Sequence, residues 1–162
     1  MIRTVAPLAL LTLLIACKAP ATPQEPALEF PQGAVRAALD QPTAVATERL
    51  KDIYPKARVV PGPLHRIVTS DEQVEELILF QDMRSARVNS VVVKFSERLT
   101  ETERRAILKT TGVDELAQLK AGEVQESAHE GLLWRARWGD RQGRLTVTVE
   151  APREVSPAPR AR

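Results

Sequence analysis

The sequence predicts a single α+β domain in which helices pack on antiparallel β-meanders. Apolar residues recur with a helical period in 44–54, and they alternate with polar residues in 87–95 and in 132–149. These segments follow one another in the order helices, strands, helices, strands, which suggests two similar α/β halves. At 162 residues, the chain has the length of one ordinary domain.

We expect the domain to begin with two helices, at 33–39 and 44–54. On the second helix, one face is expected to carry the apolar residues Ala46, Leu50, Ile53 and Tyr54. Pro55 ends this helix, because proline lacks the backbone N–H that a further helical turn needs.

Three strands, at 64–69, 74–81 and 87–95, are expected next as a meander. The middle segment is ambiguous, because Ser70 followed by Gln73 also has the spacing of a helix capping box. We favour a strand, since 74–81 contains a short, compact apolar run and adjoins the clear alternation of 87–95.

The second half is expected to begin with a helix that starts at a capping box formed by Thr100 and Glu103. Gly112 supplies a left-handed stop after it. A short helix at 114–120 follows, and 124–127 adds a strand.

The last two strands are predicted as a hairpin, because apolar and polar residues alternate on both sides of a glycine-flanked loop at 139–143. This alternation places Trp134 and Trp138 on the buried face. Arg135 and Arg137 then lie on the opposite face and form a basic strand surface.

The N-terminal segment has the pattern of a secretory signal. Arg3 is the only charge before Cys17, and the residues between them are mostly apolar. This run is shorter than the roughly 20 residues that span a bilayer, so a transmembrane helix is not expected. Residues 1–16 are therefore interpreted as a signal peptide.

Leu14-Ile15-Ala16-Cys17 resembles the lipobox of bacterial lipoproteins, in which a dedicated peptidase cuts before the cysteine. The resemblance implies that Cys17 carries several acyl chains, which anchor a protein stably in a membrane. Lys18 after the cysteine favours the outer membrane, with the domain facing the periplasm, over the inner membrane. Because Cys17 is the only cysteine, the mature chain has no disulfide and depends on its core.

Proline-rich segments flank the predicted domain. Residues 17–32 are interpreted as the lipidated cysteine and an extended, semi-rigid linker. The single α+β domain is expected at 33–150, and a disordered basic tail at 151–162.

Residues 35–43 have the sequence VRAALDQPT, in which an expected helix ends shortly before a proline. This segment resembles the small lipoprotein of the outer-membrane β-barrel assembly machinery and the related β-lactamase-inhibitor-like fold. In that family a short helix ends in Leu-Gly-x-Pro before a meander of strands, and Asp40 stands where the family has its glycine. The resemblance implies protein–protein contact without catalysis.

The sequence has no motif for catalysis or metal binding. His65 and His129 are the only histidines, and lipidation removes the only cysteine, so no zinc site can be built from Cys and His alone. Acidic pairs such as Glu75-Glu76 are interpreted as charges at turns and helix starts. We expect no cofactor, and the balanced charge and few aromatic residues argue against nucleic-acid binding.

We therefore expect a non-catalytic interaction or structural module, lipid-anchored in the bacterial envelope, with an envelope protein as its partner. The candidate binding surfaces are the strand face of Arg135 and Arg137, and the loop that Arg84 and Arg87 flank. Two alternatives stay open. One is a small envelope hydrolase that uses His129 and unrecognised carboxylates, and the other is an inhibitor or ligand-binding module that uses the hairpin face.

Overall fold

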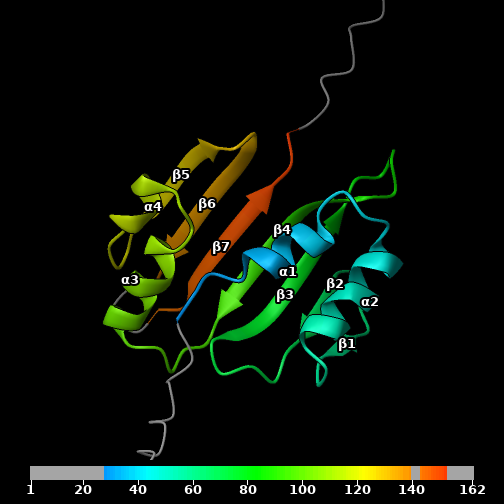
Figure 1. Cartoon of the computed structure of the whole chain (residues 1–162), viewed down its shortest axis with the longest axis horizontal. Coiled ribbons are helices and arrows are strands. Elements are labelled where there is room, and N and C mark those ends of the chain that lie inside the picture. The colour runs from blue at the N-terminus through cyan, green and yellow to red at the C-terminus, as the bar shows by residue number, and fades with distance from the viewer. Residues whose placement is uncertain (1–27, 140–142, 153–162) are drawn as a thin grey trace, which may run out of the picture.

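The computed structural model of the protein describes residues 28–139 and 143–152. In these residues a pair of helices precedes a group of strands, and this arrangement occurs a second time along the chain (Figure 1). The first group of elements is α1 (Gln32–Ala38), α2 (Thr43–Ile53), β1 (Arg58–Val60), β2 (His65–Val68), β3 (Val74–Gln81) and β4 (Val88–Phe95). The second group is α3 (Glu101–Lys109), α4 (Asp114–Ala117), β5 (Val124–His129), β6 (Leu132–Trp138) and β7 (Leu145–Glu150).

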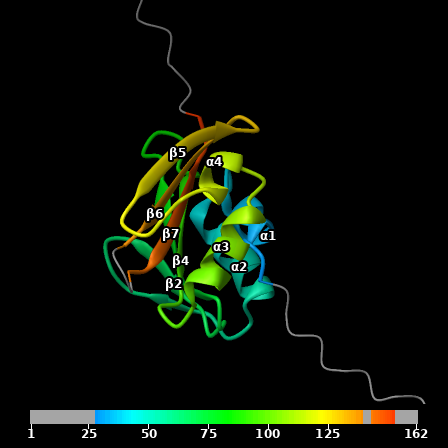
Figure 2. The same ribbon diagram turned by 90° about the vertical axis from the view of Figure 1, so that its left-hand side faces the viewer.

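The seven strands of the described residues form one antiparallel sheet in the order β1-β2-β3-β4-β7-β6-β5. The helices lie against one face of this sheet, and the other face is left open (Figure 2). The predicted α+β class, with helices on antiparallel meanders, is therefore confirmed.

The two groups of elements share one order, two helices followed by a meander of three strands, apart from the additional short strand β1. They meet at β4 and β7, which pair with Val92 opposite Thr148 at the centre. The strands β2-β3-β4 and β5-β6-β7 are thus arranged symmetrically about this pair. The chain consists of two topologically similar halves, as its sequence suggested.

One hydrophobic core fills the space between the sheet and the helices. Trp134 and Trp138 are buried on the helix side of β6, as the alternation of the hairpin predicted. Leu50 of α2 and Leu108 of α3 belong to the same buried cluster, so both halves share it. The sheet and the helices each have one apolar face, and a single two-layer packing buries both.

The segment 74–81 is a strand, and the alternative that it forms a helix is wrong. It pairs with β2 on one side and with β4 on the other. The residues before it form a turn, in which Asp71 Oδ1 accepts hydrogen bonds from the N–H groups of Gln73 and Val74, each at 2.8 Å.

The capping box predicted for α3 is present. The Thr100 side chain accepts a hydrogen bond from the Glu103 N–H, and the Glu103 carboxylate accepts one from the Thr100 N–H at 2.6 Å. Gly112 after the helix has a left-handed φ of 76°. The next helix, α4, ends at Ala117 rather than near 120, because the N–H groups that follow bond three residues back and tighten the turn.

The folded domain begins before residue 33. Phe30 is buried, and its ring centroid lies 6.1 Å from that of Phe95 and 5.3 Å from that of Trp134. The Phe30 N–H donates to Thr110 Oγ1 at 2.7 Å. The prolines of 17–32 predict a linker that extends to residue 32, but the packing of Phe30 makes residues 28–32 part of the domain.

The turn between α1 and α2 is tied to the sheet. Asp40 has a φ of 57°, a left-handed angle that aspartate tolerates and that glycine adopts freely. The Asp40 N–H donates to the Val88 carbonyl, and the Val88 N–H donates to the Gln41 carbonyl, each at 2.8 Å. These bonds hold the α1–α2 turn beside the β3–β4 turn.

Candidate functional site

The open face of the first half is apolar at the end nearest the β3–β4 turn. Ile78 pairs with Val92 across the strands, and Phe80 lies two residues further along the same face. Phe80 is 38% exposed, and Leu64, which directly precedes β2 at this end, is 40% exposed. We call Leu64, Ile78, Phe80 and Val92 the open-face patch.

The open face of the second half is mostly polar, although Val124 of β5, which pairs with Arg137, is 58% exposed there. Thr148 and Thr146 on β7 pair with Arg135 and Arg137 on β6. Both arginines are exposed on the face opposite the tryptophans, where the sequence placed them. Arg135 Nε donates to Glu126 Oε2 at 2.7 Å. Arg137 has no side-chain partner among the residues that the structure describes.

Arg84 and Arg87 lie in the β3–β4 turn, and β7 separates β4 from the strand that carries Arg135 and Arg137. The four arginines therefore occupy two places rather than one surface. The Arg87 guanidinium donates to the Asp40 carbonyl at 2.6 Å and lies 3.5 Å from its carboxylate, so it clamps the α1–α2 turn. Within the described chain, the Arg84 guanidinium makes no hydrogen bond or salt bridge, and its charge acts on the Asp82 carboxylate.

The sequence reasoning missed a buried charge on the open face. Glu76 is 4% exposed and accepts hydrogen bonds from Arg66 Nε and Lys94 Nζ. Burial raises the pKa of Glu76, but the hydrogen bonds and charges of Arg66 and Lys94 outweigh it and hold the pKa below its ordinary value. The interpretation of Glu75-Glu76 as turn charges is wrong for Glu76, which lies within β3. The only indication in the sequence was the two-residue period of the strand, which places Glu76 on the same face as Ile78.

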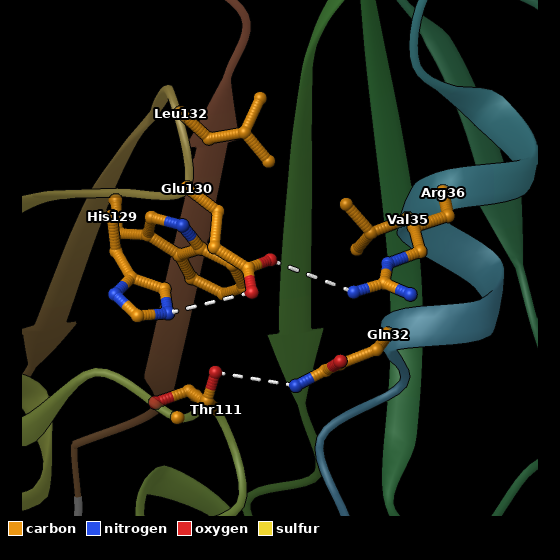
Figure 3. Close-up of a pocket in the computed structure, with 9 residues that line it drawn as sticks. Gln32, Val35, Arg36, Thr111, His129, Glu130 and Leu132 are labelled. Carbon is orange, nitrogen blue, oxygen red and sulfur yellow. Dashed lines mark hydrogen bonds and ion pairs between the residues drawn. The ribbon is translucent and has the colours of Figure 1, made fainter.

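A small pocket lies where the two halves meet (Figure 3). Helix α1 contributes Gln32, Val35 and Arg36, and the end of β5 with the following turn contributes His129 and Glu130. The cavity measures about 110 Å³. The Glu130 carboxylate lies 4.0 Å from His129 Nε2 and 3.6 Å from the Arg36 guanidinium, so the Arg36–Glu130 ion pair bridges the two halves at the surface.

This pocket offers little for catalysis. Its one hydroxyl, that of Thr111, donates to the Leu108 carbonyl at 2.7 Å and accepts from the Val113 N–H at 3.2 Å. His129 thus has a carboxylate neighbour but no free nucleophile among the residues that line the cavity. The cavity is also smaller than the roughly 300 Å³ at which ligand pockets begin. The described residues give the hydrolase alternative no support.

Within 28–139 and 143–152, no group of three or more His, Cys, Asp or Glu side chains is placed to hold a metal ion. No helix in these ranges has the length and apolar character needed to cross a bilayer. The predicted lipidation site, Cys17, lies outside the described residues, as do the predicted signal peptide at 1–16, most of the predicted linker and most of the basic tail.

No family model matches the chain, and neither the curated proteins nor the solved structures contain a significant match to it. The open face, the β3–β4 turn and the pocket between the halves are the features from which a function can be inferred.

Proposed function

We propose that the chain is a lipid-anchored module of the bacterial outer membrane that faces the periplasm and binds another envelope protein without catalysis. The signal-like segment that ends at Cys17 supports the anchor. The open-face patch supports the binding of a protein.

The observation that carries the proposal is the apolar character of an uncovered sheet face. An antiparallel sheet with one face in water normally alternates, with apolar side chains inward and polar side chains outward. In β3 and β4 this alternation is broken, because Ile78, Phe80 and Val92 alternate with core residues of their strands and so lie on the other face, although Ile78 is itself only 7% exposed. Figure 2 shows that the helices leave this face of the sheet open. Apolar side chains that gather on a surface mark interaction sites more often than scattered ones do.

The charges beside the open-face patch fit a protein interface. Glu76, Arg66 and Lys94 form a hydrogen-bonded border along the same face. Interfaces combine an apolar centre with a polar rim, and fixed charges at the rim select the partner and its orientation.

The test is chemical cross-linking of the lipidated protein in its native envelope, with adducts identified by mass spectrometry. The Leu64→Asp/Phe80→Asp double variant should lose the adduct to the main partner, because it places two charges in the open-face patch. The matched control, Thr146→Asp/Thr148→Asp, changes the polar half of the same face and should keep the adduct. Equal adducts from both variants would contradict the proposal, provided that their circular dichroism spectra match the wild type.

The anchor has a separate test. Metabolic labelling with a palmitate analogue should mark the wild-type chain but not Cys17→Ala, and fractionation should place the labelled protein in the outer membrane. Labelling of both chains would disprove lipidation at Cys17, and recovery in the inner membrane would disprove the location.

A further inference from the structure

The β3–β4 turn, residues 82–87, projects beyond the sheet at the end of the molecule far from Leu28, where the described chain begins (Figures 1 and 2). Met83 at its tip is 93% exposed, more than any other large hydrophobic residue of the described chain. Arg84 follows it, exposed, and among the described residues its guanidinium makes no hydrogen bond or salt bridge, although its charge acts on the Asp82 carboxylate. A long apolar side chain and an exposed positive charge thus stand next to each other at this tip.

The turn is held in one shape by its own hydrogen bonds. Asp82 Oδ1 accepts from the N–H groups of Arg84 and Ser85, each at 2.8 Å, and from the Ser85 hydroxyl at 3.2 Å. The two backbone bonds, together with the Ser85 hydroxyl and the charge of Arg84, lower the pKa of Asp82. The Asp82 N–H donates to the Arg87 carbonyl at 2.8 Å and closes the base of the turn.

Two further features restrict the turn. Ala86 has a φ of 56°, a left-handed angle that is unfavourable for a residue with a Cβ. Arg87 clamps the turn to Asp40. Backbone strain of this kind persists only where the surroundings enforce it, and it is concentrated at functional sites. A loop that already has its bound shape loses little entropy when it binds.

We propose that this turn anchors the protein–protein contact: Met83 enters an apolar pocket of the partner protein, and Arg84 pairs with a carboxylate at the rim of that pocket. The inference rests on the proposed function and specifies the chemistry of the partner. Met and Arg are enriched at protein interfaces, where an apolar anchor in a pocket beside an arginine contributes much of the affinity. Asp82 is bonded to backbone N–H groups of the turn and Asp40 faces Arg87, whereas the Arg84 guanidinium makes no hydrogen bond or salt bridge among the described residues and can pair with an acidic rim.

A protein pocket fits the turn better than a lipid surface does. One exposed apolar side chain buries too little area for stable membrane association, which scales with the apolar area buried. Phe80 of the open-face patch lies three residues before Met83, so a single protein partner can cover both. The turn also lies far from Leu28, where the described chain begins.

The experiment places the photo-cross-linking amino acid p-benzoylphenylalanine at Met83, and separately at Phe80, in the full lipidated chain in its native envelope. Both positions should yield adducts to the same protein. Peptide mapping should place the Met83 adduct in an apolar pocket of that protein with an Asp or Glu at its edge.

Binding of the captured protein is then measured with purified variants. Met83→Ser and Arg84→Glu should each weaken binding roughly tenfold or more. Arg137→Glu is the matched control, because it reverses an equally unpaired, exposed arginine in the other half, and it should leave affinity within about twofold. Changing the partner's rim carboxylate to lysine should restore binding to Arg84→Glu.

The outcomes separate the two proposals. Adducts from Phe80 with none from Met83, or equal losses from Arg84→Glu and Arg137→Glu, would overturn the role of the turn and leave the open-face proposal standing. No adduct from either position would overturn both. An adduct between two copies of this chain, or Arg84-dependent binding to protein-free phosphatidylglycerol vesicles, would overturn the acidic-rimmed protein pocket.

Discussion

The two halves of the molecule share an order of elements but differ on the face that the helices leave open. The first half has the apolar open-face patch and the buried Glu76, whereas the second half has threonines and the exposed Glu126–Arg135 pair. On the helix side both halves are apolar and contribute to one core. Packing in this core explains why the face of the sheet that the helices cover is apolar in both halves. Ile78 on the open face is also buried, but Leu64 and Phe80 of the patch are 40% and 38% exposed, so these two apolar side chains point to binding rather than folding.

The largest expected loss of stability comes from a comparison of the two faces of the first half. Phe95→Ala removes a fully buried ring where the halves meet and should lower the free energy of unfolding by about 3–5 kcal/mol. Phe80→Ala, an open-face phenylalanine on the neighbouring strand, should cost about 1 kcal/mol, since its ring is already partly in water. Urea unfolding followed by circular dichroism and tryptophan fluorescence measures both. Equal losses, or separate transitions for the two probes, would contradict a shared core with an open outer face.

The next contrast compares one carboxylate in each half. Glu76→Gln removes a buried charge from between two cations and should destabilise the fold by about 2 kcal/mol. Glu126→Gln removes an exposed partner of Arg135 and should cost less than about 0.5 kcal/mol. The same urea experiment measures both variants, and a Glu76→Gln variant as stable as Glu126→Gln would show that the buried triad contributes nothing.

The pH dependence sharpens this contrast. The pKa of Glu76 is lower in the folded protein than its ordinary 4.5. The ionised carboxylate therefore stabilises the fold at pH values above the unfolded pKa, and this contribution is lost as the pH falls through the folded pKa. The difference in unfolding free energy between wild type and Glu76→Gln should be full at pH 7 and shrink as the pH drops below about 4.5. A difference that stayed constant down to pH 3 would argue for a packing effect instead.

A smaller loss of stability is expected when the cap at the start of α3 is removed. Helix α3 has a capping box, whereas α1 and α2 follow Pro31 and Pro42 and have no side-chain cap. Thr100→Ala should cost about 1 kcal/mol, because the Glu103 N–H loses its acceptor. Thr102→Ala, an exposed change in the same helix, serves as the control. Thermal unfolding should show a lower midpoint for the first variant alone.

The smallest expected effects on stability are in the β3–β4 turn. Met83→Ser and Arg84→Glu should each change the unfolding free energy by less than about 0.5 kcal/mol, because both side chains lie in water. Unfolding curves that coincide with the wild type would show that any loss of binding comes from lost contacts. A loss above 1 kcal/mol would mean that the tip also supports the fold.

Local patterns in the sequence predicted most of the elements. The alternation around Trp134 and Trp138 placed a hairpin, and the spacing of Thr100 and Glu103 placed the start of a helix. Both signals arise from residues a few positions apart. The linker boundary was wrong because Phe30 gains its burial from Phe95 and Trp134, which are distant in the sequence.

The candidate site was predicted only in part. Arg84 and Arg87 marked the β3–β4 turn, but the exposure of Met83 could not be read from a single methionine between two charges. Glu76 was misinterpreted because its partners lie 10 and 18 residues away on the neighbouring strands. A charge in a strand pattern shows no burial until the cations beside it are known.

The sequence by itself determined which segments are helices or strands and which side chains of each segment share a face. Only the tertiary structure decided the order of the strands. The pairing of β4 with β7 brings the two halves into one sheet, and it sets the apolar face of the first half beside the polar face of the second. The reason is physical: periodicity reflects interactions within a segment, whereas strand order depends on long-range packing in the shared core.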